Sequence, residues 1–234
     1  AMGGREVGGL SNLLSAHRDM ANPAHRAEVA ALWGVDSVPA TPGKSAVELF
    51  KALKSGEVKA VWIACTNPAQ SMPDQALIHD ALKTAEFVIV QEAFGHTETC
   101  AYADLLLPAT TWGEKEGTVT NSERAITRVR AAVSAPGEAR HDWAIVVDFA
   151  RRLGTRLGKG SLAERMFPYA SPEEIWNEHW ESTRGRDLDI TGMSYAMLEQ
   201  VGPQQWPFPE GASAGKVRLY EDGVYPTPSG RARF

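Results

Sequence analysis

The sequence predicts an α/β fold, a Rossmann-like open parallel sheet flanked by helices, with an irregular C-terminal extension. Two short apolar runs, at residues 60–64 (AVWIA) and 87–91 (FVIVQ), are separated by an amphipathic segment at 75–85. A parallel strand is buried on both faces and needs a helical crossover, so this alternation is typical of parallel α/β units. Right-handed crossovers bring the turns after both strands to one edge of the sheet, where α/β proteins bind nucleotides.

The composition is that of a globular protein, with 234 residues and a hydrophobic fraction of 43%. The net charge of -5 does not favour nucleic-acid or membrane-surface partners, which usually require a positive face. The sequence contains no run of about eighteen apolar residues, so it predicts no membrane span. The two cysteines, Cys65 and Cys100, have no CxxC partner and predict neither an iron–sulfur motif nor a zinc site. We expect both to be reduced and structural.

Helix caps and apolar periodicity predict the other elements. Ser171 and Glu174 form a capping box that opens one helix, and Thr191 is the candidate cap of another. The segment WGEKEGTVTNSER, which follows the apolar run 105–107, is expected to be a loop. The predicted helices are residues 23–33, 46–55, 75–85, 97–104, 141–157, 171–184 and 191–201.

Three parts are expected along the chain. Residues 1–45 are a glycine-rich loop and a helix that continue from a missing segment. Residues 46–160 are the α/β core, and residues 161–234 are a helical and irregular extension that leads to a missing C-terminal domain. The glycine-rich opening AMGGREVGGL and the proline-rich end motivate this expectation, because neither closes a domain.

Polar side chains follow both predicted strands. Asn67 lies in the turn after 60–64, which has no GxGxxG and no P-loop lysine and so is not an ordinary dinucleotide or triphosphate site. Gln91 and Glu92 end the second strand, and nucleotide-binding sheets place an acceptor for ribose hydroxyls about twenty residues beyond the first turn. A plain polar turn and a solvated glutamate are the ordinary alternatives.

Lys115 and Asp142 are two further candidates. Gly113 and Gly117 flank the Lys115 region and would let backbone N–H groups approach an anion. The alternative is an exposed charged turn. Asp142 opens a predicted helix, where an acidic residue normally complements the helix dipole. Its more specific interpretation is a carboxylate that accepts two N–H bonds from a guanine edge. The histidines show no metal-ligand spacing and no serine lies in a nucleophile elbow, so the sequence predicts no metal ligand and no catalytic residue.

Together these stretches resemble the molybdopterin oxidoreductases, and most closely the bacterial assimilatory nitrate reductases. The matching text is AMGGREVGGLSNLLSAHR, VWIACTNPAQSMPD, VIVQEAFGHTETCAYADLLLPATTWGEKEGTVTNSERAITRVR, APGEARHDW, QQWP and TPSGRARF. The resemblance implies a fragment, inactive alone, of a cytoplasmic enzyme that reduces nitrate to nitrite. It implies molybdenum held by two molybdopterin guanine dinucleotides, and a four-iron four-sulfur cluster outside this chain. The electron donor would be ferredoxin, flavodoxin or an NADH-linked subunit.

Carried over by position, the resemblance implies that 46–160 is a guanosine-binding core. Arg5 in REVGG matches a position near the substrate entrance, where a guanidinium could hold nitrate. Two alternatives stay open: a formate dehydrogenase or other oxyanion reductase of the same family, and a cofactor-free structural homologue. The positions that match cofactor contacts are Asn67, Gln91, Glu92, Lys115 and Asp142.

Overall fold

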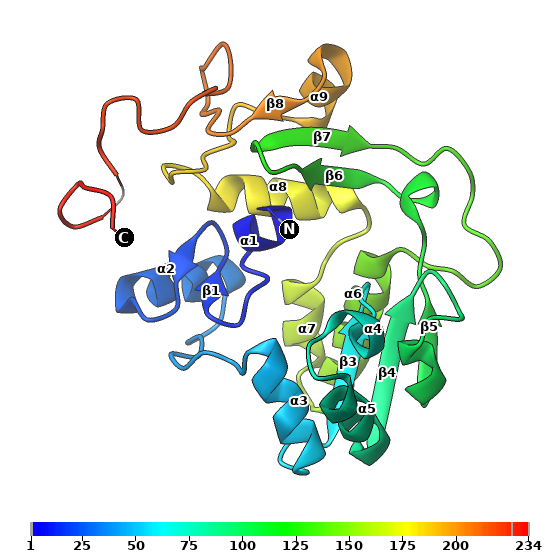
Figure 1. The fold of residues 1–234 in the computed structure, drawn as a ribbon. Coiled ribbons are helices and arrows are strands. Elements are labelled where there is room, and N and C mark those ends of the chain that lie inside the picture. The colour runs from blue at the N-terminus through cyan, green and yellow to red at the C-terminus, as the bar shows by residue number, and fades with distance from the viewer. Residues whose placement is uncertain (1, 226, 234) are drawn as a thin grey trace. The chain divides into compact units, whose positions relative to one another are not determined.

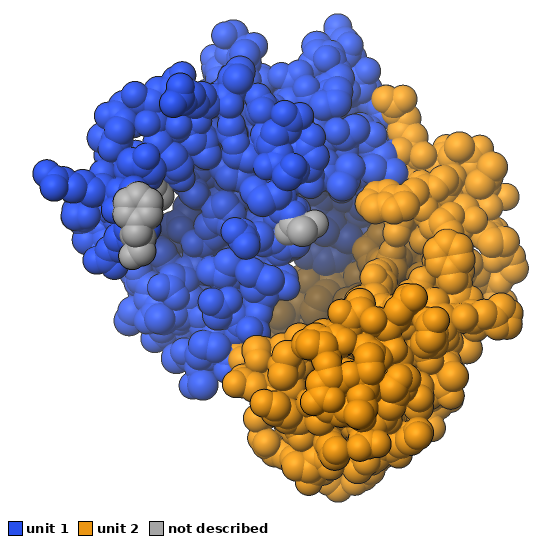
Figure 2. Space-filling model, viewed as in Figure 1, with its two compact units in different colours: residues 1–42, 117–129, 169–234 blue, residues 43–116, 130–168 orange. Residues whose placement is uncertain are grey.

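The computed structural model describes residues 2–225 and 227–233, and the chain forms two compact units. Unit 1 consists of residues 1–42, 117–129 and 169–234, and unit 2 of residues 43–116 and 130–168. Figure 2 shows them in blue and orange. The expected three-part division at 1–45, 46–160 and 161–234 stays a prediction. No helix in the described part of the chain combines the length and the apolar character that crossing a membrane requires.

The centre of unit 2 is a three-stranded parallel sheet (Figure 1), which confirms the predicted α/β fold. It contains β3 (Ala60–Ala64), β4 (Phe87–Glu92) and β5 (Leu105–Pro108), in the order β3-β4-β5. Both predicted strands occur, and the apolar run at 105–107 adds the third. Each step along the sheet is parallel, as helical crossovers require.

The two faces of this sheet are covered by different helices. Alternate strand residues such as Ile63 and Val90 pack against α3 (Ala46–Lys54) and α5 (Gln75–Thr84) in one buried cluster. On the opposite face, Trp62 meets Phe149 of α6 (Asp142–Arg156) edge to face, with ring centroids 4.9 Å apart. Unit 2 is therefore a helix–sheet–helix sandwich.

The expected helix at 97–104 is wrong. Only a four-residue 3-10 helix, η1 (Thr99–Tyr102), forms there. A second short element, α4 (Pro68–Ser71), is a single helical turn in the polar segment between β3 and α5. The Asp104 carboxylate accepts a hydrogen bond from the Val88 N–H, and the Asp104 N–H donates to the Val88 carbonyl. These two bonds to β4 pull the chain into the sheet, so a longer helix cannot continue.

The expected loop WGEKEGTVTNSER is wrong over much of its length. It contains a short 3-10 helix, η2 (Trp112–Glu114), and then β6 (Gly117–Thr120), which pairs antiparallel with β7 (Ala125–Val129). β8 (Gln204–Gln205) extends this sheet. The alternation of apolar and polar residues in GTVT and AITRV was the missed signal, and it buries Ile126 of β7 in unit 1.

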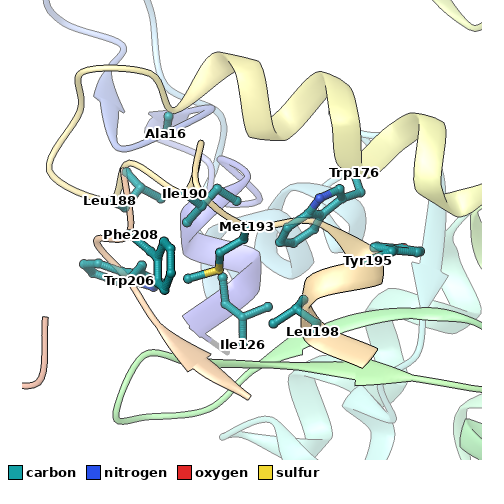
Figure 3. Close-up of a cluster of buried hydrophobic side chains, with 10 residues drawn as sticks. All are labelled: Ala16, Ile126, Trp176, Leu188, Ile190, Met193, Tyr195, Leu198, Trp206 and Phe208. Atoms are coloured by element: carbon teal, nitrogen blue, oxygen red, sulfur yellow. The ribbon is translucent and has the colours of Figure 1, made fainter. Parts of the chain in front are cut away.

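Unit 1 has its own core (Figure 3), in which ten buried side chains, Met193 among them, form one cluster. Beside that core the Glu6 carboxylate is buried and accepts hydrogen bonds from the Trp206 indole N–H at 2.6 Å and from the Thr120 hydroxyl at 2.8 Å. The elements of unit 1 outside the β6–β7–β8 sheet are α1 (Met2–Glu6), β1 (Leu13–Leu14), β2 (Arg18–Asp19), α2 (Pro23–Trp33), α8 (Pro172–Ser182) and α9 (Tyr195–Val201).

Side-chain caps set most helix starts as predicted. Asn22, Ser45 and Ser171 accept backbone N–H bonds at the starts of α2, α3 and α8. The start expected at Thr191 is wrong: α9 begins at Tyr195, and Ser194 accepts the Met197 N–H. The Thr191 hydroxyl instead donates to Asp189 at 2.6 Å, which removes it as a cap. Helix α7 (Gly160–Met166) was not predicted.

Helices α6 and α7 approach closely at Gly154. A Cβ at this glycine would lie 2.3 Å from the Ala163 Cβ, far inside contact distance. We therefore expect Gly154→Ala to destabilise unit 2 by roughly 1–3 kcal/mol through overpacking, despite the better helix propensity of alanine. Thermal unfolding followed by circular dichroism measures this. Adding Ala163→Gly should restore part of the loss, and no recovery in the double variant would contradict the proposed clash.

Candidate functional site at the carboxyl edge of the parallel sheet

Three parallel strands end together at one edge of the unit 2 sheet. Gln91 of β4 pairs with Ala64 at the end of β3 and with Leu107 near the end of β5. A parallel bridge between Ala109 and Arg140 brings the start of α6 to the same edge. Segments distant in sequence therefore meet where α/β sheets generally bind ligands.

The Asp142 carboxylate is the centre of this edge. It lies in the first residue of α6 and accepts the Gln91 side-chain N–H at 2.8 Å on Oδ1. Lys115 Nζ donates to Oδ2 at 2.9 Å, and the Cys65 thiol donates to Oδ1 at 3.3 Å. The structure thus brings together three of the five predicted cofactor-contacting residues, and adds a cysteine that the sequence indicated only as structural.

This environment keeps Asp142 ionised. Burial alone would raise the pKa of Asp142, but hydrogen bonds from Lys115, Gln91 and Cys65 outweigh burial and lower it below the ordinary aspartate value. The N-terminus of α6 also favours a negative charge. A lowered pKa means that this carboxylate contributes stability above the unfolded-state pKa and loses it as the pH falls through the folded-state pKa.

Cys65 occupies a left-handed backbone position, with φ of 57°, immediately after β3. Burial and the neighbouring Asp142 charge raise the pKa of its thiol to about 11. At pH 8 we expect Cys65 to react with iodoacetamide about 100-fold more slowly than an unperturbed thiol, because the thiolate is the nucleophile. Alkylation of a Cys100→Ser variant, followed by mass spectrometry, measures this rate. Adding Asp142→Asn should speed the reaction. An ordinary alkylation rate with Asp142 intact would contradict the assigned environment.

Asn67 lies in the turn after β3, and the side chain holds this turn to η1. Its Oδ1 accepts the Thr99 N–H at 3.1 Å and the Thr99 hydroxyl at 2.6 Å. Its Nδ2 donates to Glu98 at 2.5 Å and to Gln70 at 3.2 Å. Asn67 is therefore at the predicted edge, but its side chain is occupied by contacts with Thr99 of η1, with Glu98 and with Gln70.

Of the two remaining predicted residues, Glu92 belongs to unit 2 and Arg5 to unit 1. Glu92 follows Gln91 at the end of β4, and its Oε1 accepts the N–H groups of Ala93 at 2.7 Å and Phe94 at 3.3 Å. Its charge reaches the same edge, because it contributes to raising the Cys65 pKa. Arg5 is an exposed residue of α1, in unit 1.

The chemistry of this edge is that of polar recognition. It offers an ionised carboxylate, an ammonium and two side-chain amides, which suit a ligand with N–H donors and an anionic part. Within the described residues no group of three or more His, Cys, Asp or Glu side chains could hold a metal ion. Thr99, which is fully buried, was missed, and no sequence signal marks it because its role depends on its contact with Asn67.

Comparison with known proteins gives consistent matches over the chain. Residues 2–152 match a family model described as Molybdopterin oxidoreductase. The chain is 43% identical to a nitrate reductase of Synechocystis, over 100% of this chain and 32% of the relative. It is 39% identical to the assimilatory nitrate reductase catalytic subunit of Bacillus subtilis, over 94% of this chain and 30% of the relative. It is 32% identical to formate dehydrogenase H of Escherichia coli, over 99% of this chain and 30% of the relative.

A solved structure shares the fold. Acetylene hydratase from Pelobacter acetylenicus superposes with a TM-score of 0.57 at 22% identity, covering 79% of this chain and 23% of that one. The chain spans about a third of the length of the curated relatives given above.

Proposed function

Because the chain belongs to the molybdopterin oxidoreductase family, we propose that it is part of a molybdenum-dependent nitrate reductase, which reduces nitrate to nitrite. We propose that it contributes part of the domain that binds molybdopterin guanine dinucleotide, and that it is inactive alone. The nitrate reductases of Synechocystis and Bacillus subtilis support the substrate, and the small share of their length that the chain spans supports the partial role.

The observation that carries this proposal is the gathering of Gln91, Lys115 and Asp142 at the carboxyl edge of the sheet. The site also has an unmet hydrogen-bonding demand. Gln91 Oε1 is buried and has no hydrogen-bond partner among the described residues, although its amide nitrogen is bound to Asp142. Buried polar atoms are nearly always paired, so a ligand N–H or O–H fits this position.

Asp142 suits the guanine edge. A carboxylate has about four acceptor positions, and protein donors occupy three on Asp142, from Gln91, Cys65 and Lys115. Guanine presents two adjacent N–H donors, so one of the present donors must give way. Lys115 is the donor that can move, because its long side chain can turn the ammonium toward the phosphates. Gln91 would keep the carboxylate in place.

The other predicted residues receive complementary roles. Glu92 would accept ribose hydroxyls with its carboxylate, and Asn67 would shape the turn beside the nucleotide through its bonds to Thr99. Arg5 would hold the nitrate anion at the substrate entrance of the full-length enzyme. The Arg5 assignment rests on the resemblance of REVGG alone.

The cofactor of the full-length enzyme would be bis-molybdopterin guanine dinucleotide with molybdenum, which supplies the redox chemistry of nitrate reduction when bound. Electrons would come from ferredoxin, flavodoxin or an NADH-linked subunit, by way of a four-iron four-sulfur cluster held outside this chain. We propose that the enzyme is cytoplasmic, on the basis of its similarity to an assimilatory nitrate reductase of Bacillus subtilis.

The guanosine assignment can be tested on this chain. We expect weak binding of GDP, with a dissociation constant of about 1 mM or above, and weaker binding of ADP, in a titration followed by NMR. We also expect no molybdenum by mass spectrometry of the metal content. Equal affinity for ADP and GDP would contradict the guanine site, and stoichiometric molybdenum would contradict the partial role.

A formate dehydrogenase is the second candidate, because formate dehydrogenase H of Escherichia coli also matches nearly the whole chain. The two enzymes would share the nucleotide-binding edge, so the residues of this edge do not distinguish a nitrate reductase from a formate dehydrogenase. An assay of the full-length protein with nitrate and with formate distinguishes them. We expect turnover of nitrate, and turnover of formate alone would replace the proposed substrate.

A further inference from the structure

Trp112 is an exposed aromatic side chain near the carboxyl edge of the unit 2 sheet, where its ring contacts Lys115. It directly precedes the glycine of the GEKEG segment, and 64% of its surface is exposed. Tryptophan combines a large apolar ring with a polar N–H and is enriched at binding interfaces. None of the roles proposed above uses this ring.

The backbone beneath Trp112 is held firmly. Trp112 begins η2, whose capping box has Thr111 and Glu114 bonded reciprocally, with the Thr111 N–H donating to the Glu114 carboxylate at 2.9 Å. The neighbouring Gly113 carbonyl accepts the N–H groups of Ala132 at 2.8 Å and Val133 at 3.0 Å. The ring is therefore carried by a fixed turn, as a preorganised contact surface requires.

The Lys115 ammonium connects this ring to Asp142. Its Nζ lies 5.1 Å from the Trp112 ring centroid, in a cation–π contact, and 2.9 Å from Asp142 Oδ2. The Lys115 ammonium thus interacts with the face of the Trp112 ring and with the Asp142 carboxylate at the same time. A purine that presents N–H groups to Asp142 would make the same two contacts, by its edge and by its face.

On the basis of the proposed guanosine site, we propose that Trp112 is the stacking surface for the base that Asp142 recognises. The base takes the place of the Lys115 ammonium between the ring and the carboxylate, and the ammonium turns to the phosphates. Phe94 is similarly exposed after β4, but Trp112 is the aromatic residue whose ring contacts the Lys115–Asp142 pair. Stacking on an aromatic ring accepts any base, so Trp112 would supply affinity and Asp142 the preference for guanine.

The test uses the chain labelled with 5-fluorotryptophan and followed by fluorine NMR during titration with GDP to about 10 mM, a range suited to millimolar affinity. The Trp112→Phe variant assigns the Trp112 signal among the seven tryptophans. We expect this signal to shift with GDP. We expect Trp112→Ala to weaken GDP binding by about 5-fold or more, so that GDP no longer saturates the chain at about 10 mM, and Trp112→Phe to weaken it less. Trp33→Ala, at an exposed tryptophan of α2, is the matched control and should not change GDP binding.

The possible results separate this proposal from the guanosine site. A Trp112 signal that stays still while GDP binds, with affinity that falls in Asp142→Asn but not in Trp112→Ala, overturns the stacking role and leaves the guanosine site intact. No GDP-dependent change in any signal overturns both. If Trp112→Ala fails to fold, as judged by circular dichroism, the shift of the Trp112 signal and the affinity of Trp112→Phe decide the question.

Discussion

Replacing Asp142 with asparagine in the full-length protein is expected to weaken cofactor binding about 30- to 150-fold. This corresponds to roughly 2–3 kcal/mol, the value of a charge-assisted pair of hydrogen bonds. The physical cause has two parts. An amide oxygen can accept only one guanine N–H, and the amide NH₂ group would face the second guanine N–H, donor against donor. Molybdenum content per purified chain measures the loss.

Asp148→Asn is the matched control for this experiment. Asp148 lies on the same helix, α6, but its carboxylate pairs with Arg140 at 2.9 Å and Arg152 at 2.7 Å. These are largely exposed ion pairs, which contribute little to stability. Molybdenum content should therefore stay near the wild-type value in Asp148→Asn. Equal molybdenum in both variants would favour the cofactor-free structural homologue over the proposed guanosine site.

Trp206→Ala is expected to destabilise unit 1 by roughly 3–5 kcal/mol, the usual cost of removing a buried aromatic side chain. Trp206 is 4% exposed and belongs to the core shown in Figure 3. The substitution leaves a cavity and also takes the indole donor away from the buried Glu6 carboxylate, 2.6 Å away. Differential scanning calorimetry should show one transition lowered by roughly 10–20 °C.

Two control variants separate the causes of that loss. Trp206→Phe keeps most of the ring volume and removes only the N–H donor to Glu6, so its destabilisation should be smaller, at roughly 1–3 kcal/mol. Trp33→Ala removes a partly exposed tryptophan in the same unit and should cost least. A Trp206→Ala transition no lower than that of Trp33→Ala would show that the Trp206 ring does not stabilise unit 1.

The parallel sheet could be predicted from the sequence because its determinants are local. Apolar runs long enough for buried strands, and caps such as Asn22 and Ser45, act within a few residues, and the elements they predict occur. The two failures have different causes. The helix expected over 97–104 is interrupted by bonds to Asn67 and to β4, which are non-local. The hairpin β6–β7 has a local signal, the alternation in GTVT and AITRV, and the expected loop overlooked it.

The candidate site was predictable to a similar degree. Strand ends identified Gln91 and Glu92, and the helix start identified Asp142, because parallel topology alone brings such positions to one edge. The contacts between them were not predictable. Nothing in the spacing indicates that Cys65 donates to Asp142, or that Asn67 turns toward Thr99, since both depend on the side-chain directions of folded turns. Whether these residues hold a nucleotide remains a proposal.

The hydrogen bond between Glu6 and Trp206 has a consequence for how the protein is made. A ribosome releases the chain from its N-terminus, so Glu6 must wait for 200 further residues before its indole partner emerges. The strands of unit 2 pair over much shorter separations, as between Trp62 and Ile89, and can assemble while synthesis continues. We therefore expect chaperones to bind unit 1, rather than unit 2, while its fold is still incomplete.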